Sequence, residues 1–363
     1  MGASSLESLL RRAATRDDPA LWHRQAGAWT PGGEAPGRDV RELAAALQHF
    51  GAGPGTSALV LGREGPDTSR ASLAVLVAGA CLVRLDAGVS DALLRHALEA
   101  QHVVLALVED DHQLRRVLAL RPDLPELEIV ILLDAAPSER KAPALLVGAA
   151  ADIGAARLDE DPSALERGRG ESPGGATALL VPSGDRLRSL SADALAAAAE
   201  RWTDEVSIGP GRNVLVALPP DGIESVPVLV GALARGATLL ILGAGESLGD
   251  GLRQRPPDGA IVSASTLTRL YEEWCADFEG HSWWGRRCTR WALELGADPA
   301  RRPRLSHLAD ALILSRVRRR WGGRLRGWAV LGDPATREIS EFFASAGLPI
   351  YVMPGVAPAV VAR

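Results

Sequence analysis

Short apolar segments alternate with helical segments along most of this 363-residue chain. Segments 57–61, 82–85 and 103–108 are apolar runs of strand length, and each is followed by a stretch with helical spacing of its apolar residues. Parallel strands need a crossover that returns the chain to the same edge of the sheet, and a helix is the usual crossover. The sequence therefore predicts an α/β fold built on parallel-strand sheets.

A stretch rich in Ala, Pro, Gly and charged residues interrupts this alternation at 135–175. Such a composition is typical of a surface linker, and we expect one short helix in it, near 144–150. The sequence thus predicts a first α/β lobe over 1–134, the linker over 135–175, and a second α/β lobe over 176–363. Expected strands of the second lobe are 177–182, 213–218, 237–242, 259–262, 327–331 and 349–353, and its expected helices are 190–205, 223–235, 265–276, 283–295, 305–320 and 335–346.

Composition and charge argue against several classes of protein. The formal net charge is −5, whereas a general nucleic-acid binder is usually basic. The cysteines Cys81, Cys275 and Cys288 have no C-x-x-C spacing, so we expect neither a disulfide framework nor a zinc site, and a reducing cytoplasm as the location. The histidines lack metal-ligand spacing and no G-x-S-x-G motif occurs, which gives hydrolase chemistry no support. We also expect no secretory signal and no membrane span.

The segment 177–200 has the layout of a phosphate-binding turn. Its apolar run ends at Ser183 and Gly184, and the residues after the turn have helical spacing. In a strand–turn–helix unit, backbone N–H groups and the helix N-terminus can hold a nucleotide phosphate. Ser189 or Ser191 would alternatively serve only as the cap of that helix, and this structural role is the favoured one.

Several segments, in order along the chain, resemble one family. Residues 39–55 (DVRELAAALQHFGAGPG), 228–242 (VLVGALARGATLLIL) and, most specifically, 304–351 (RLSHLADALILSRVRRRWGG to GLPIY) are similar to segments of adenylate-forming, AMP-binding enzymes of the long-chain fatty acid–CoA ligase type. The chain is identified as a truncated and degenerate member of that superfamily. The resemblance implies a two-lobed parallel-sheet domain like the N-terminal domain of acyl-CoA synthetases. Because the chain ends at Arg363, the family's β-rich subdomain and C-terminal lid are expected to be missing.

The resemblance places the family's phosphate loop at Ser183. The family carries S-G-T-T-G-x-P-K-G there, whereas this chain has S-G-D-R-L-R from Ser183 to Arg188. The threonines, the later glycine and the lysine are missing, and the loop is about four residues short. Arg186 and Arg188 either replace the lysine, since guanidinium groups bind phosphate well, or are solvent-exposed charges on a short turn. We favour the second alternative because the glycines that admit a phosphate are gone.

The other nucleotide-site motifs of the family are also altered. The motif Y-G-x-T-E, which supplies a threonine near the phosphate and a glutamate for the metal, falls on 354–358, where Ala357 and Pro358 take those two places. The motif G-G-A-P falls on 331–334 and is kept in part. The positions that match the family's nucleotide site, as vestigial ones, are Ser183, Gly184, Arg186, Arg188, Gly332 and Gly355. We therefore predict weak or absent binding of ATP and Mg²⁺, no catalytic residue and no metal ligand.

A region rich in arginine and tryptophan covers 281–326. Arginines from Arg316 to Arg326 flank Trp321 in the sequence. Three more tryptophans lie upstream, at Trp283, Trp284 and Trp291. The region either contacts a membrane surface or an acidic partner, or it is a solvated helix face with a few core tryptophans. The sequence favours the solvated face, because charge runs usually lie in solvent.

Two functions of different classes follow from these observations. The first is a non-catalytic acyl-CoA synthetase-like protein that acts as a binding, scaffolding or regulatory subunit, with a protein partner or as a homo-oligomer. The second is a remnant enzyme that binds an acyl group or adenylate and completes its site with another chain. Drift without a selected function is a third alternative. For the first function, we expect the association surface to include the apolar tail residues Val352, Met353, Val356, Val360 and Val361.

Overall fold

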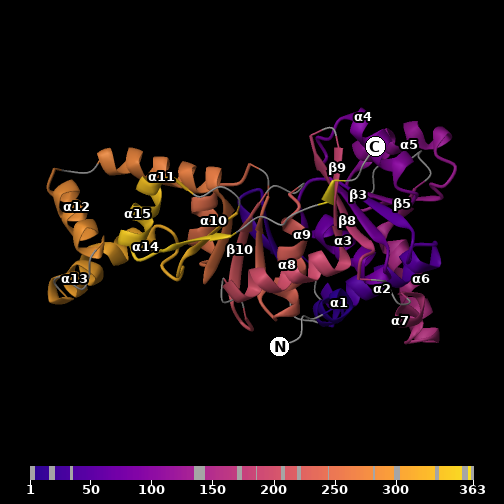
Figure 1. Cartoon of the computed structure of the whole chain (residues 1–363), viewed down its shortest axis with the longest axis horizontal. Helices are drawn as coiled ribbons and strands as arrows, with labels where there is room; N and C mark the ends of the chain where they lie inside the picture. The colour runs from indigo at the N-terminus through magenta and orange to yellow at the C-terminus, as the bar shows by residue number, and fades with distance from the viewer. Residues whose placement is uncertain are drawn as a thin grey trace.

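The structure of the protein, a computed structural model, is an elongated arrangement of helices around two sheets (Figure 1). It describes residues 5–15, 21–32, 36–134, 144–169, 174–184, 186–205, 209–218, 222–243, 245–280, 283–297, 303–331, 335–353 and 359–360. Both sheets of these residues are largely parallel. The α/β fold with parallel sheets is therefore confirmed.

The first sheet has the strand order β15-β9-β8-β4-β3-β5-β6-β7. Its strands are β3 (Ser57–Leu61), β4 (Cys81–Leu85), β5 (Val103–Val108), β6 (Ile129–Leu132), β7 (Leu145–Leu146), β8 (Thr177–Ser183), β9 (Arg186–Ser191) and β15 (Ala359–Val360). The pairs from β8 across to β7 are parallel. By contrast, β9 is antiparallel to both β8 and β15, so one side of this sheet ends in an antiparallel ribbon.

The second sheet has the strand order β14-β13-β12-β10-β11-β1-β2. Its strands are β1 (Leu21–Gln25), β2 (Ala28–Pro31), β10 (Asn213–Ala217), β11 (Thr238–Leu242), β12 (Gly259–Ser263), β13 (Trp328–Leu331) and β14 (Ile350–Met353). All neighbours are parallel except β1 and β2, which form a hairpin at one edge.

Helices connect most of these strands. They are α1 (Leu6–Ala14), α2 (Pro36–His49), α3 (Pro66–Ala78), α4 (Asp91–Ala100), α5 (Asp111–Leu120), α6 (Val147–Glu160), α7 (Ala164–Arg169), α8 (Ala192–Glu205), α9 (Ser225–Ala234), α10 (Leu248–Gln254), α11 (Ala264–Glu279), α12 (Trp283–Ala297), α13 (Pro303–Ala309), α14 (Ser315–Arg319) and α15 (Arg337–Ser345), with a 3₁₀ turn η1 (Arg121–Asp123) and a π-helical turn η2 (Asp310–Leu314). Side-chain oxygens of Ser90, Asp110 and Thr336 accept hydrogen bonds from backbone N–H groups and fix where α4, α5 and α15 begin.

Successive side chains along each strand point to opposite faces of the sheet, and the core is therefore divided into layers. In β3, Ala58 and Val60 face a cluster shared with the second sheet, whereas Leu59 faces a cluster shared with α4 and α5. In β10, Val214 faces the shared cluster and Leu215 faces α10, α11 and α15. Because both faces of each sheet are covered, these strands are apolar on both sides.

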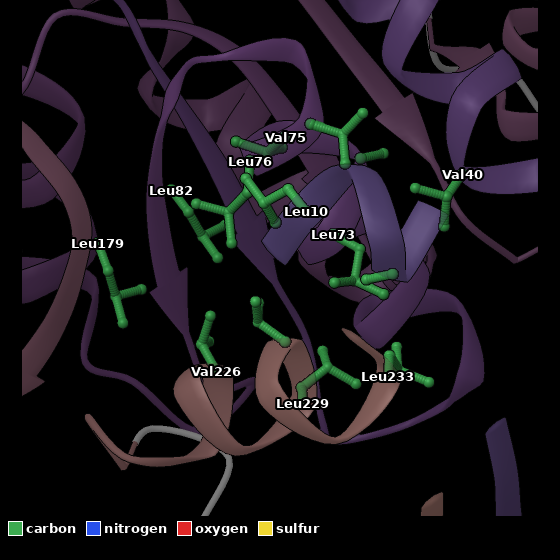
Figure 2. Close-up of a cluster of buried hydrophobic side chains, with 14 of the residues drawn as sticks. Leu10, Val40, Leu73, Val75, Leu76, Leu82, Leu179, Val226, Leu229 and Leu233 are labelled. Atoms are coloured by element: carbon green, nitrogen blue, oxygen red, sulfur yellow. The ribbon is translucent and has the colours of Figure 1, made fainter. Parts of the chain in front are cut away.

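Helices α3 and α9 fill the space between the two sheets. Both are apolar around most of their circumference, which is typical of helices that are buried on all sides. Figure 2 shows Leu73 and Leu76 of α3 and Leu229 and Leu233 of α9 gathered with Leu82 of the first sheet. Helix α1 adds Leu10 to the same cluster, and we call this cluster the central layer.

The two sheets do not correspond to the lobes predicted over 1–134 and 176–363. Strands β1 and β2, from the N-terminal part, join β11 in the second sheet, and β8 and β9 join β4 in the first. Each sheet therefore contains strands from both predicted lobes, and the predicted boundary is wrong for the sheets. Local composition reveals a strand but not its partner, which is decided by packing between segments far apart in sequence.

The stretch 135–175 is more than a surface linker. Instead of one short helix near 144–150, it contains β7, which extends the first sheet, and the helices α6 and α7. Helix α6 lies so close to α2 that a Cβ atom added at Gly154 would be 1.7 Å from the carbonyl oxygen of Glu42. The small residues that suggested a linker thus permit close helix packing. Parts of the stretch lie outside the described residues.

Candidate functional site

Open parallel sheets bind ligands at the carboxyl ends of their strands, where the strand order reverses. In the second sheet this reversal lies between β10 and β12, because β11 follows β10 on one side and β12 lies on the other. At the end of β12, the Ser263 hydroxyl accepts a hydrogen bond from the Thr266 N–H at 3.2 Å. It also lies 2.9 Å from the Ser265 hydroxyl and 2.8 Å from the Thr266 hydroxyl. A group of hydroxyls thus lies at the position where a ligand is expected, and no motif in the sequence indicates it.

The turn at Ser183 and Gly184 joins two antiparallel strands. Ser183 pairs with Arg186, and Pro182 pairs with Leu187, so two residues connect β8 to β9. Gly184 has a φ of 62°, the left-handed conformation that tight hairpin turns require. The predicted strand–turn–helix layout is therefore wrong, because the whole of β9 lies between the turn and α8.

The side chains of β9 contact both faces of the first sheet. Leu187 is buried in the cluster shared with α4 and α5, and Leu190 is buried in the cluster shared with the second sheet, whereas Arg186 and Arg188 are exposed. The two buried leucines are three residues apart, which is also a helical spacing, and they precede a helix with strong spacing of its own. The capping prediction is confirmed for Ser191, whose hydroxyl accepts a hydrogen bond from the Ala194 N–H at 3.2 Å.

The connection along the chain between β14 and β15 limits how far this hairpin can lie from the second sheet. Strand β14 ends at Met353 in the second sheet, and Ala359 pairs with Ser189 in the first. Val360 pairs with Arg188 in the same ladder. Six residue steps separate Met353 from Ala359, and a chain of that length spans at most about 20 Å. Strand β9, which contains Arg188, therefore lies within about 25 Å of the carboxyl end of β14.

Two predicted site positions, Gly332 and Gly355, lie outside the described residues, as do Asp185 and residues 219–221. In sequence, Gly332 directly follows β13 and Gly355 follows β14 by two positions. Of the six predicted site positions, the structure thus describes Ser183, Gly184, Arg186 and Arg188, which lie together on the β8–β9 hairpin.

The corresponding reversal point of the first sheet, between β3 and β5, is filled by the protein's own side chains. Glu109 accepts hydrogen bonds from the backbone N–H of Arg63 at 2.8 Å and from its Nε at 2.9 Å. A Cβ atom at Gly62 would be 2.6 Å from the Cβ atom of Glu109. The buried Arg84 donates to the carbonyl oxygen of Gly62 at 2.8 Å. These contacts fill the space at the carboxyl ends of β3 and β5. The reversal point of the second sheet is therefore the more suitable position for a ligand.

A cavity of about 490 Å³ lies at the opposite edge of the first sheet, where β3, β4 and β8 begin. Its lining includes Cys81 and Arg169. Burial raises the pKa of the Cys81 thiol to about 12, so the thiol stays protonated and is a poor nucleophile. The Arg169 guanidinium donates to the Val77 carbonyl oxygen at 2.7 Å. The described residues contain no group of three or more His, Cys, Asp or Glu side chains placed to hold a metal ion.

Comparison with known proteins supports the fold. Residues 13–166 match the family model of AMP-binding enzymes. No curated protein matches the chain by sequence.

Solved structures share the fold over nearly the whole chain. The acetoacetyl-CoA synthetase of Streptomyces lividans has a TM-score of 0.65 and 18% identity, over 98% of this chain and 53% of that one. The adenylation domain of a carboxylate reductase from Mycobacterium chelonae has a TM-score of 0.69 and 18% identity, over 100% of this chain and 59% of that one. The N-terminal domain of FACL13 from Mycobacterium tuberculosis has a TM-score of 0.61 and 11% identity, over 97% of this chain and 76% of that one.

At such low identities the likeness establishes the fold alone. This chain spans little more than half of the length of the first two of these proteins. The family match covers residues 13–166, which include the strands β3 to β6 of the first sheet. Residues 13–166 therefore match the AMP-binding enzyme family, and the fold over nearly the whole chain is that of the N-terminal part of acyl-CoA synthetases and related adenylating enzymes.

Proposed function

We propose that this chain is a non-catalytic acyl-CoA synthetase-like protein, which acts as a binding, scaffolding or regulatory subunit. The observation that carries the proposal is the direct pairing of Ser183 with Arg186 at the position of the family's phosphate loop. A phosphate is held by several backbone N–H groups that converge on it. Only residues 184 and 185 lie between the paired strands, so the turn offers too few such groups.

The strands on either side of the turn do not supply the missing donors. Pro182 has no N–H group, and it pairs with Leu187 in the ladder between β8 and β9. On the other side of β9, Arg188 and Ser189 pair with β15. Backbone groups in these ladders are engaged with neighbouring strands and are not free to turn toward a phosphate.

The composition of the neighbouring motifs supports the same proposal. Adenylation builds charge on phosphoryl oxygens, and cations and Mg²⁺ must balance that charge. Asp185 instead adds a negative charge at the turn, and Ala357 and Pro358 have no side-chain group that donates a hydrogen bond or binds a metal ion. These substitutions remove several contributions to phosphate binding at once.

A second function is supported by the exposed arginines of the hairpin. The side chains of Arg186 and Arg188 are exposed on β9, and guanidinium groups bind phosphate with two parallel hydrogen bonds. If another chain completed the site, such a surface would bind an acyl-adenylate. This remnant-enzyme function predicts binding that depends on the arginines.

Calorimetric titration of the chain with ATP and Mg²⁺ tests these alternatives. The non-catalytic function predicts no measurable binding in the micromolar range and no acyl-dependent exchange of pyrophosphate into ATP. Low-micromolar binding that is lost in Arg186→Ala, but not in Arg337→Ala, would favour the remnant enzyme. Arg337 is a matched control because it is exposed on α15, outside the hairpin.

The proposal also predicts that the chain associates with a partner protein or with itself. On β14, Val352 is exposed, as the sequence predicts, and Tyr351 beside it is exposed as well. The expectation for Met353 is wrong, because this side chain lies on the face of the strand opposite to Val352 and is buried in the central layer. The side chains of residues 354–363 lie outside the described residues.

Light scattering coupled to size exclusion measures this association directly. We expect an oligomer of the purified chain or a complex with a partner, weakened by the double variant Tyr351→Ser/Val352→Ser. The exposed pair Leu146→Ser/Ile153→Ser on β7 and α6 is the control. A monodisperse monomer that recovers no partner would contradict a scaffolding role.

A further inference from the structure

The helices α12, α13 and α14 with the turn η2 form one end of the elongated molecule, at the left of Figure 1. We call this part the distal helices. Three tryptophans of α12 are exposed there: Trp283 at 56%, Trp284 at 68% and Trp291 at 41%. Tryptophan is a large apolar side chain that is highly buried on average. The interpretation of these residues as core tryptophans is therefore wrong, although it holds for the buried Trp321.

The tryptophans share α12 with arginines. Trp284, Arg287 and Trp291 are three and four residues apart, so they line one face of the helix. The Arg287 guanidinium lies 5.6 Å from the centre of the Trp283 ring, and the rings of Trp283 and Trp284 meet edge to face at 4.6 Å. Arg290 is also exposed. This helix thus presents aromatic rings and guanidinium groups on the same surface.

The next helical segment repeats the arrangement with leucines. Leu305, Leu308 and Leu312 on α13 and η2 are exposed, at the three- and four-residue spacing of one helix face. Arg316 and Arg319 continue that spacing and are exposed as well. Two successive helical segments therefore expose apolar side chains beside arginines.

The opposite faces of these helices are packed. Ala292, Ala309 and Leu314 form a small buried cluster between α12 and the segment that follows it. A Cβ atom at Gly296 would lie 2.0 Å from the carbonyl oxygen of Ser345, so α12 lies directly against α15. The exposed tryptophans are therefore held on the outer side of a helix that is already packed within the chain.

Charge identifies what this surface would bind. Residues 283–320 contain ten arginines and three acidic residues, a formal net charge of +7. The whole chain has a net charge of −5, so the remaining residues together carry −12. A basic end on an acidic molecule is attracted to an anionic surface and orients the molecule toward it.

We propose that the distal helices dock on the surface of a membrane that contains anionic lipids. Tryptophan rings would lie at the level of the headgroups, the leucines deeper, and the arginines against lipid phosphates. None of the helices in the described part of the chain has the length and apolarity of a membrane span. This proposal does not depend on whether the nucleotide site binds ATP.

Vesicle sedimentation tests the proposal with the full chain. We expect binding to phosphatidylcholine vesicles that contain phosphatidylglycerol, weaker binding without the anionic lipid, and a loss of binding at high salt. The triple variant Trp283→Ala/Trp284→Ala/Trp291→Ala is expected to bind at least about tenfold more weakly. Arg287→Gln/Arg290→Gln should lower the affinity for anionic vesicles only.

The control is the pair Leu146→Ala/Ile153→Ala, which removes exposed apolar side chains elsewhere and should bind like the unchanged protein. Tryptophan fluorescence provides a second measurement, since rings that enter the headgroup region shift to shorter wavelength. Absence of vesicle binding would overturn the proposal, and so would binding that the triple variant retains. Self-association or capture of an acidic protein that needs the tryptophans, without vesicle binding, would assign the surface to a protein instead.

Discussion

The central layer and the distal helices use apolar residues in opposite ways. In the central layer, α3 and α9 are enclosed between two sheets, and their apolar side chains lie in contact with strands on both sides (Figure 2). In the distal helices, α12 packs against α15 on one side, and its tryptophans remain exposed on the other. Apolar content alone therefore does not distinguish core from contact surface. The number of sides on which an element is covered makes that distinction.

The fold and the β8–β9 connection support different conclusions. The sheets and central helices are arranged as in the solved structures of adenylating enzymes. The β8–β9 connection is a hairpin turn of two residues. A packed core of this kind therefore accommodates a short turn between β8 and β9.

The largest effect is expected from removing a side chain of the central layer. Leu82→Ala should lower the free energy of unfolding by about 2–5 kcal/mol, because it leaves a cavity between β4 and the central helices. Leu308→Ala removes the same atoms from the exposed face of α13 and should change stability by no more than about 0.5 kcal/mol. Urea unfolding of both variants measures the difference. Equal losses would mean that Leu308 is covered, which would weaken the contrast between the two regions.

A smaller effect is expected where the distal helices join the body. Gly296→Ala should cost about 1–3 kcal/mol, since its Cβ atom would meet the backbone of Ser345. Gly154→Ala should do the same where α6 contacts α2. Gly148→Ala is the control, because the space around this helical glycine is open, and it should be neutral or stabilise by up to about 1 kcal/mol. Thermal unfolding ranks the variants, and a neutral Gly296→Ala would show that α12 is not seated on α15.

The two regions should also respond differently to pH. His23 on β1 is buried, and desolvation together with the positive charge of Arg70 lowers its pKa from 6.5 to about 3. The unfolded chain therefore takes up more protons than the folded chain between these values, and stability falls as the pH drops below 6.5. Between pH 6.5 and pH 5.5 the loss should be about 1 kcal/mol.

His23→Gln should remove this dependence, whereas His307→Gln on the exposed face of α13 should keep it. The interval above pH 5.5 is chosen because Asp258 and Asp310 also have lowered pKa values and lose their stabilising effect at more acidic pH. Urea titrations at the two pH values give the slope for each protein. A slope that is unchanged in His23→Gln would contradict the burial of a neutral imidazole.

The smallest effect is expected at the hairpin turn. Gly184→Ala should cost about 1 kcal/mol, because its φ of 62° is unfavourable for a residue with a Cβ atom. Gly184→Asn should cost less, since asparagine adopts this conformation more readily. Chemical denaturation compares the two, and identical stability of both with the unchanged protein would indicate an open loop instead of a tight turn. That outcome would remove the observation on which the non-catalytic function depends.

The elements of the fold could be predicted more reliably than their arrangement. Strands and helices in the first half, such as 57–61 and 103–108, appear in the structure at the predicted positions, because strong apolar periodicity outweighs context there. The short strand β9 was not predicted, since its six residues adjoin a helix with strong spacing of its own. The exposure of Trp283 and Trp284 was not predicted either, because a sequence does not state which helix faces are covered.

The sequence was sufficient to predict the class of fold, the resemblance to the family and the departures at 183–188 and 354–358 from the family's nucleotide-site motifs. These are properties of residue type and spacing, and they are present before any contact forms. The tertiary structure alone decided which strands share a sheet, that α6 lies against α2, that the Ser183 turn closes a hairpin, and which tryptophans stay exposed. Each of these depends on contacts between residues far apart in the chain, where the packing of a partner element sets the outcome.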